Sequence, residues 1–186
     1  LQLFCAVAPL RKLADVLENV VTSLVDADFL RVASTHPEVR YVVSHALLQE
    51  AIYASIPYAQ RRRLHASIAS WYEAQGTQAN THKLLAHHYS HGGQPGKALL
   101  ALETAGAEAQ KRHNSGEAAR LYARALQVFD ECYSADNSRK ARQHRGNLEL
   151  ALGRAQVSCS NYADAIHHLE CGLTRLGYRV PRSAVW

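Results

Sequence analysis

Three histidines are the first candidates for chemistry in this sequence. His87, His88 and His91 form an H-H-x-x-H pattern, in which His87 and His91 would share one face of a helix. Two imidazoles at that spacing can bind Zn²⁺, but a complete site needs further ligands. The candidates for a third ligand are His82 and Glu103, and spacing fixes neither of them. We favour polar histidines on a helix surface and predict no metal site.

A glycine-rich segment, Gly92 to Ala98, invites comparison with a phosphate-binding loop. The pattern G-x-x-x-x-G-K-[ST] would need glycine where His91 stands and serine or threonine where Ala98 stands, and no strand is predicted before it. A tight turn between two helices explains the same residues. We therefore predict that this segment binds no nucleotide.

Two basic clusters could contact phosphates. On a helix, Arg61, Arg62 and Arg63 spread over nearly 200° of surface, so at most two of them share a face. We expect a solvated basic face there, beside a buried stripe of Leu64, Ile68, Trp71 and Tyr72. The second cluster comprises Arg139, Lys140, Arg142 and Arg145 at the start of a helix, where cations are slightly unfavourable and leave room for an acidic neighbour. The net charge of the chain is +5, but acidic and basic residues are interleaved along its whole length. We therefore predict no nucleic-acid partner.

Residues for catalysis and cofactor binding are not found in this sequence. There is no G-x-S-x-G elbow and no pair of acids placed to face a substrate. The four cysteines, Cys5, Cys132, Cys159 and Cys171, include no C-x-x-C pair, which favours reduced, mostly buried thiols over a zinc site or a disulfide framework. We predict no catalytic, cofactor-binding or metal-binding residues in this chain.

The first 56 residues predict a helix, a small hairpin and a second helix. Apolar residues at helical spacing indicate a core-facing helix over residues 10–27. Two β-prone runs, Phe29 to Val32 and Arg40 to Val43, predict a two-stranded hairpin. Ser44 is the predicted N-cap of a helix that continues to Tyr53. This order resembles the end of a winged-helix unit.

The rest of the chain predicts antiparallel helices alone. Their expected spans are 57–75, 80–91, 96–112, 115–133, 139–158 and 161–176. Most connections are short, so neighbouring helices must run antiparallel, as in a helical solenoid. The longer connection, residues 134–138, is the expected flexible joint.

Small and aromatic residues in this region match the tetratricopeptide pattern in part. One match fits every position of the pattern and comprises Leu85, Ala86, Tyr89, Ala98, Leu102 and Ala105. A second contains Leu152, Gly153, Ala165 and Leu169 but departs at Gln156 and Gly172. The triplet Ala118, Tyr122 and Ala125 follows the first match after fewer residues than a full repeat. We predict an all-α fold, a tetratricopeptide-like solenoid with an irregular register.

Several phrases of the sequence resemble one family. They are Tyr41 to Tyr53, Arg61 to His65, Leu85 to Tyr89, Lys97 to Leu99, Ala105-Gly106 and Leu176 to Pro181. The chain is similar to the region that follows the AAA-type (STAND) ATPase module in soluble class III adenylate or guanylate cyclases, and in related ATPase-containing transcriptional regulators and kinases. The resemblance covers nearly the whole chain, but none of its phrases is catalytic.

The resemblance implies a winged-helix remnant over residues 1–56 and a tetratricopeptide-like region over 57–186. It implies a regulatory arm that contacts ATPase or cyclase modules of the same protein, or a peptide. No Walker motif and no cyclase aspartates match here, so ATP and Mg²⁺ would belong to upstream parts. Because the chain starts at Leu1 and lacks methionine, we expect it to be part of a longer protein. Without a signal peptide or a long apolar run, we expect a cytoplasmic location and no membrane partner.

Two alternatives remain at this point. The first is an interaction module of an unrelated scaffold, which would bind a short peptide. The second is an enzyme or metal protein that uses His87 and His91.

Overall fold

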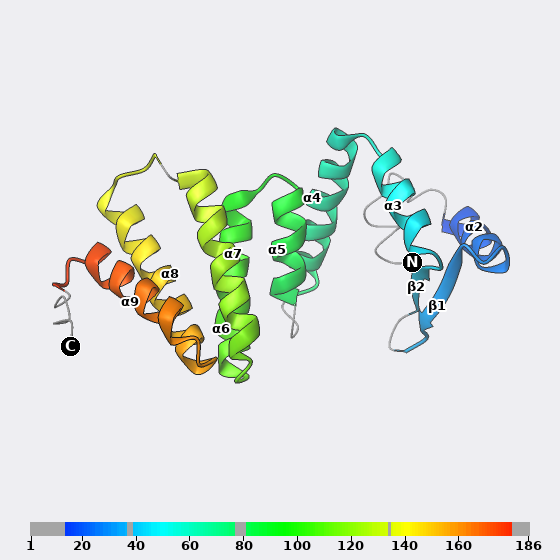
Figure 1. Cartoon of the computed structure of the whole chain (residues 1–186). Helices are drawn as coiled ribbons and strands as arrows, with labels where there is room; N and C mark the ends of the chain where they lie inside the picture. The colour runs from blue at the N-terminus through cyan, green and yellow to red at the C-terminus, as the bar shows by residue number, and fades with distance from the viewer. Residues whose placement is uncertain (1–13, 37–38, 77–80, 134, 180–186) are drawn as a thin grey trace. The chain divides into compact units, whose positions relative to one another are not determined.

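The computed structural model describes residues 14–36, 39–76, 81–133 and 135–179. Its described part is mostly helical with one small antiparallel sheet (Figure 1). The chain divides into two compact units. The first comprises residues 1–76 with 91–93, and the second comprises residues 77–90 with 94–186.

The first unit begins with the predicted helix and hairpin. Helix α2 spans Ala14–Asp26, and the first four residues of the predicted span 10–27 lie outside the described residues. Strands β1 (Leu30–Ser34) and β2 (Arg40–Val43) pair antiparallel, with an irregular register near the end of β1. The structure therefore confirms the predicted hairpin.

The predicted cap of the next helix is wrong by one residue. Helix α3 spans Ala46–Ser55, and its N-cap is His45 in an extended conformation. The N–H of Ser44 donates to the carbonyl of Phe29, so Ser44 still prolongs the pairing of the hairpin. Its hydroxyl donates to Oδ1 of Asp28 at 3.3 Å instead of capping the helix.

Helix α4, Tyr58–Ala74, buries a different stripe from the one expected. Its buried residues are His65 and Ala69. His65 is covered because the Tyr53 hydroxyl lies 3.0 Å from its Nε2 and the His91 ring stacks on it with centroids 5.0 Å apart. The residues of the predicted stripe are only half-buried: Leu64, Ile68, Trp71 and Tyr72. That prediction followed hydrophobicity alone, whereas these contacts fall on the neighbouring face.

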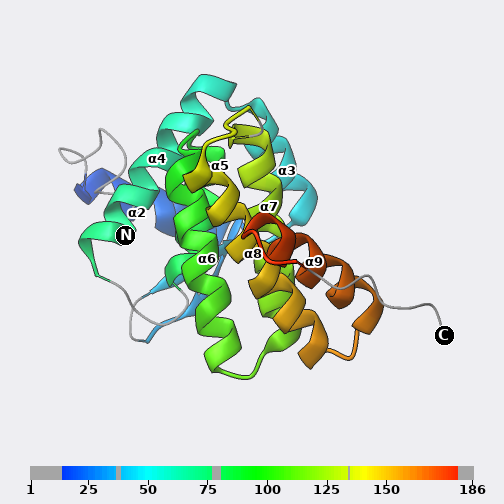
Figure 2. The same cartoon turned by 90° about the vertical axis from the view of Figure 1, so that its left-hand side faces the viewer.

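The second unit contains α5 (Thr81–His91), α6 (Pro95–Lys111), α7 (Ser115–Tyr133), α8 (Arg139–Ser158) and α9 (Tyr162–Arg175). Each bound lies within one residue of its prediction. From α6 onward, each helix packs on the next along the chain, as Figures 1 and 2 show. In the described part of the chain, no helix is both long and apolar enough to cross a membrane.

Small residues allow these helices to approach closely. All six residues of the first repeat match are buried, and on α6 they alternate with further small residues, Ala101, Gly106 and Ala109. Helix axes can come within about 8–10 Å only where the side chains at the crossing are small. At Gly106 a Cβ atom would lie 2.8 Å from the Tyr122 ring, so that ring occupies the space that glycine leaves.

Two of these helices end in a left-handed residue that is not glycine. His113 after α6 and Ser160 after α8 have φ of 59° and 61°. In each case the next residue donates its N–H back to a carbonyl of the last helical turn, at 2.9 Å after α6 and 3.0 Å after α8. This bond ends the helix and turns the chain towards the next one.

Candidate interaction groove

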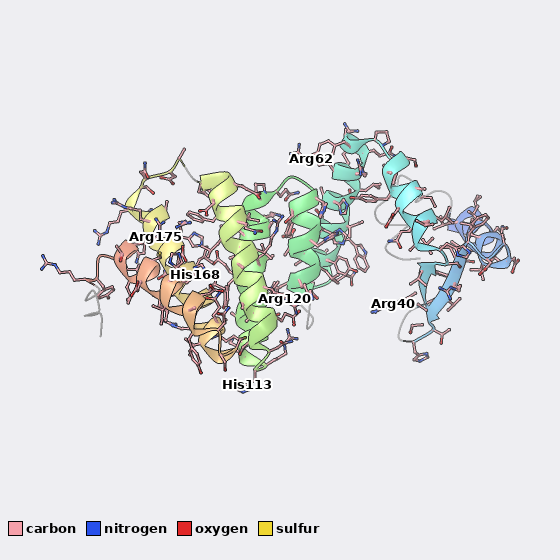
Figure 3. All side chains as sticks on the ribbon, viewed as in Figure 1. Arg40, Arg62, His113, Arg120, His168 and Arg175 are labelled. Atoms are coloured by element: carbon pink, nitrogen blue, oxygen red, sulfur yellow. The ribbon has the colours of Figure 1, made fainter. Side chains whose placement is uncertain are left out.

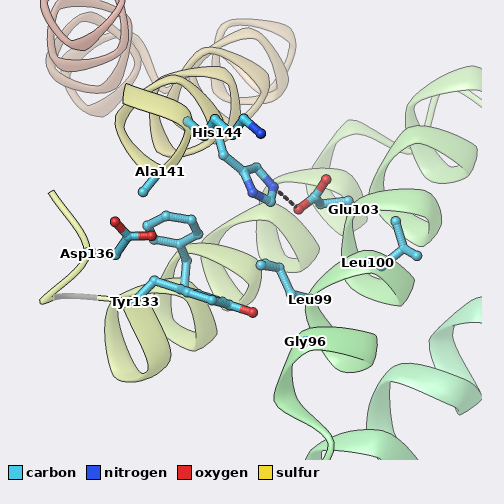
Figure 4. A pocket seen from close by; sticks show the side chains of 10 residues that line it. Gly96, Leu99, Leu100, Glu103, Tyr133, Asp136, Ala141 and His144 are labelled. Carbon is cyan, nitrogen blue, oxygen red and sulfur yellow. Dashed lines mark hydrogen bonds and ion pairs between the residues drawn. The ribbon is translucent and has the colours of Figure 1, made fainter. Parts of the chain in front are cut away.

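A groove opens in the second unit where α6, α7 and α8 meet (Figure 4). It encloses about 290 Å³. Its lining residues are Gly96, Leu99, Leu100, Glu103, Phe129, Tyr133, Asp136, Lys140, Ala141 and His144. Helix α6 supplies one wall, the end of α7 supplies the floor, and the first turns of α8 supply the other wall.

The apolar part of the groove has a buried and an exposed side. Leu99 and Phe129 are 3% and 4% exposed and belong to the helical core. Leu100 and Tyr133, which also line the groove, are 66% and 37% exposed. Gly96 leaves room for the Tyr133 hydroxyl, because a Cβ there would lie 3.3 Å from that oxygen. The groove therefore presents apolar surface that no described residue covers.

One histidine–glutamate pair closes the groove across α6 and α8. His144 Nε2 lies 2.5 Å from Glu103 Oε1, as Figure 4 shows. The edge of the His144 ring also meets Phe129, with centroids 5.3 Å apart. Burial, and to a smaller extent the Glu103 carboxylate, raises the pKa of the Tyr122 phenol behind this wall. The pair holds both side chains in place, so we assign it a structural role.

The other charged groups of the groove differ in their partners. Asp136 Oδ1 accepts a hydrogen bond from the Ser138 N–H at 2.8 Å, and the Ser138 hydroxyl in turn caps α8. The Lys140 side chain makes no ion pair or hydrogen bond with any described residue. Lys140 is therefore the unpaired charge of the groove.

A second charged network joins α7, α8 and α9 away from the groove. Arg145 donates to both carboxylate oxygens of Asp130, at 2.7 and 2.8 Å, and to buried Glu149 at 3.2 Å. Glu149 also pairs with Nδ1 of His168 at 2.5 Å (Figure 3 labels His168). Hydrogen bonding by Arg145 lowers the pKa of Asp130 below its ordinary value. Each charge in the network has a partner, so it stabilises the packing of these helices.

The histidines singled out in the sequence lie at the end of α5. His87 is exposed and His88 is half-buried. The two candidate third ligands are engaged elsewhere, because His82 pairs with Glu108 at 2.7 Å and Glu103 pairs with His144. That His87, His88 and His91 bind no metal stays a prediction.

The glycine-rich segment forms the expected turn. Helix α5 ends at His91, α6 begins at Pro95, and Gly93 has a φ of +70° that favours glycine. Arg62, labelled in Figure 3, donates to the carbonyls of Gly92 and Gly93 at 3.3 and 3.4 Å. The side chain of Arg62 thus bonds backbone oxygens at this turn.

The basic cluster on α4 is less solvated than expected. Arg61 lies over the Tyr53 ring, 4.9 Å from its centroid, and Arg62 bonds the turn just described. Only Arg63 is exposed without a contact to a described residue. The expected basic face therefore reduces to one free cation of the three.

The described cysteines are free thiols. Cys132 and Cys159 are exposed and Cys171 is half-buried, whereas Cys5 lies outside the described residues. Cys171 Sγ is 3.8 Å from His167 Nε2. Among the described cysteines the structure contains no disulfide. The expectation that the thiols are mostly buried is wrong for this part of the chain, because two of the three described cysteines are exposed.

No sequence motif predicts this groove. Glu103 is a candidate only as a metal ligand in the sequence, and the groove residues Leu100, Phe129 and Tyr133 belong to no motif. One signal was available. Leu100 lies on the side of its helix opposite Ala98 and Ala105 of the repeat match, so this leucine had to be exposed or covered by another partner.

Comparison with known proteins adds no family to these observations. No family model, no curated protein and no solved structure matches this chain.

Proposed function

We propose that this chain is a non-catalytic regulatory arm of a larger cytoplasmic signalling ATPase of the soluble cyclase type. Its first 56 residues would be the end of a winged-helix unit, and its tetratricopeptide-like helices would bind a protein partner. That partner is an ATPase or cyclase module of the same protein, or a peptide. Nucleotide, Mg²⁺ and catalysis belong to the upstream modules.

The observation that carries this proposal is the stack of helices α6 to α9 with an uncovered groove on its side. Stacked helical hairpins present extended surfaces suited to binding other proteins. Apolar side chains that face an open groove are typical of a surface that a partner covers. In the second unit, Glu103 and Glu149 pair with histidines of neighbouring helices, so these carboxylates serve helix packing. The groove therefore supports binding better than it supports chemistry.

The sequence phrases that carry the resemblance support the proposed type of parent protein. The run from Tyr41 to Tyr53 covers most of β2 and most of α3, where a helix follows a two-stranded hairpin. This order is the one expected at the end of a winged-helix unit. It favours an ATPase-linked arm over a scaffold module without such a segment.

Two measurements test the proposal. The coding sequence upstream of Leu1 should encode a phosphate-binding loop, and its absence would contradict the ATPase link. In the full-length protein, deletion of residues 77–186 should change the basal ATPase or cyclase activity, because the arm shifts the equilibrium between resting and active states. Unchanged activity with and without cellular partners would contradict the regulatory role.

A further inference from the structure

The side chains that line the groove indicate the chemistry of its partner. This inference rests on the proposed function. Its lining combines apolar side chains from α6 and α7 with charged side chains from α6, α8 and the connection before α8. Each charge can be assigned a partner or shown to lack one. What remains unsatisfied defines what the groove would bind.

The apolar requirement comes from Leu100 and Tyr133. Both line the groove and are exposed, whereas Leu99 and Phe129, which also line it, are buried. Covering apolar surface is favourable by roughly 25 cal/mol per Å². A volume of about 290 Å³ is large enough for one leucine or aromatic side chain but not for a folded segment. The partner therefore needs one protruding apolar side chain.

The charge requirement comes from the carboxylates and cations around the opening. The two carboxylates of the lining are engaged, because Glu103 pairs with His144 and Asp136 bonds the Ser138 N–H. Lys140 has no described partner. The same holds for its neighbours Arg139 and Arg142, and the first turn of α8 contains no acidic residue. The unsatisfied charge at this edge is therefore positive.

We propose that the groove binds an acidic peptide segment with one leucine or aromatic anchor. The anchor lies between Leu100 and Tyr133, and a carboxylate of the segment pairs with Lys140. Charge complementarity of this kind sets specificity and orientation more than affinity. A nucleic acid is disfavoured because a phosphate backbone would pair with Lys140 but would leave the apolar surface of Leu100 and Tyr133 uncovered.

Fluorescence anisotropy with synthetic peptides tests this inference on the 186-residue chain. The first probe has glutamates on both sides of a central phenylalanine. The second probe has lysine in place of each glutamate, and the third has alanine in place of the phenylalanine. We expect the first to bind at least about tenfold more tightly than the other two at low salt. Equal affinity for the glutamate and lysine probes, or for the phenylalanine and alanine probes, would overturn the inference.

Variants locate the binding at the groove. Lys140→Glu should weaken the acidic probe about tenfold and improve binding of the lysine probe, because one attraction becomes a repulsion. Arg154→Glu is the matched control, since Arg154 is exposed on the same helix but does not line the groove. Leu100→Ser should weaken both phenylalanine-containing probes. If Arg154→Glu weakens binding as much as Lys140→Glu, the attraction is non-specific and the inference fails.

Three further outcomes bear on this inference, and the last two separate it from the proposed function. Tighter binding of an oligouridylate than of the acidic peptide, with the same loss in Lys140→Glu, would replace the peptide by a nucleic acid. If no peptide binds but deletion of residues 77–186 still changes the activity of the full-length protein, the groove inference is wrong and the regulatory role stands. If peptide binding is confirmed but that deletion has no effect, the groove inference stands and the regulatory role is wrong.

Discussion

At the scale of single residues, the close crossing of α8 and α9 explains a departure from the repeat pattern. Gly172 stands where the pattern prefers alanine. A Cβ atom there would lie 2.9 Å from the carbonyl oxygen of Gly146 and 2.9 Å from the Leu150 side chain. Backbone on the facing helix cannot rotate away, so the two helices approach closely only because both crossing positions are glycine.

We therefore expect Gly172→Ala to lower the free energy of unfolding by about 1–3 kcal/mol, because overpacking forces the helices apart. Gly116→Ala is the control, since a Cβ at Gly116 meets nothing within 4 Å. Urea unfolding followed by circular dichroism measures both. Equal effects of the two substitutions would show that the α8–α9 crossing is not tight.

Asp130 makes the stability of the chain depend on pH in acid. Hydrogen bonding by Arg145 lowers the pKa of Asp130 in the folded chain, so folding favours its ionised form. This stabilisation is complete above the ordinary aspartate pKa of about 3.9, and it is lost as the pH falls through the lowered value. Because the Asp130 side chain is 48% exposed, its contribution should stay below about 1 kcal/mol.

The corresponding variant is Asp130→Asn. It should be less stable than the wild type at neutral pH, and the difference should shrink in acid as the pH falls through the lowered pKa of Asp130 and its carboxylate becomes protonated. Glu131→Gln serves as the control, because Glu131 is exposed and makes no ion pair with a described residue. Urea unfolding at several pH values gives the comparison. A difference that stays constant down to the lowest pH would contradict the role assigned to Arg145.

At the scale of elements, the ends of α6 and α8 use left-handed residues that glycine would fit better. A residue with a Cβ atom pays roughly 1–2 kcal/mol in this conformation. We expect Ser160→Gly, at φ 61°, to stabilise the chain by up to about 1 kcal/mol. Cys159→Gly should instead destabilise it by about 0.5–1 kcal/mol, since φ is −97° there and glycine only adds freedom to the unfolded chain. Thermal unfolding of both variants tests this; a gain from both would argue against the conformational explanation.

Element bounds were predictable from sequence because their causes are local. Pro95 marks the start of α6, and Ser138 caps α8 as a side-chain acceptor. Apolar spacing supplied the rest. The burial of His65 and the pairing of Glu103 with His144 were not predictable, because they depend on which faces of distant helices meet. The groove was not predictable for the same reason.

At the scale of the molecule, the two units differ in how well they bury apolar side chains. Of the described residues between 14 and 76, only His65 and Ala69 are buried. Helix α3 buries none, and Leu47 on it is 80% exposed. A second groove of about 300 Å³ is lined by one face of α2 together with Phe29. In the second unit, by contrast, every helix from α5 to α9 contains buried apolar residues.

The two units should therefore behave differently when they are produced separately. We expect a fragment of residues 77–186 to unfold cooperatively, because its core residues lie on its own helices. A fragment of residues 1–76 should bind a hydrophobic dye such as anilinonaphthalene sulfonate, since its helices expose apolar faces. Dye fluorescence and thermal circular dichroism of both fragments provide the comparison. A non-cooperative 77–186 fragment, or a 1–76 fragment that binds no dye, would show that the apolar core is distributed differently between the units.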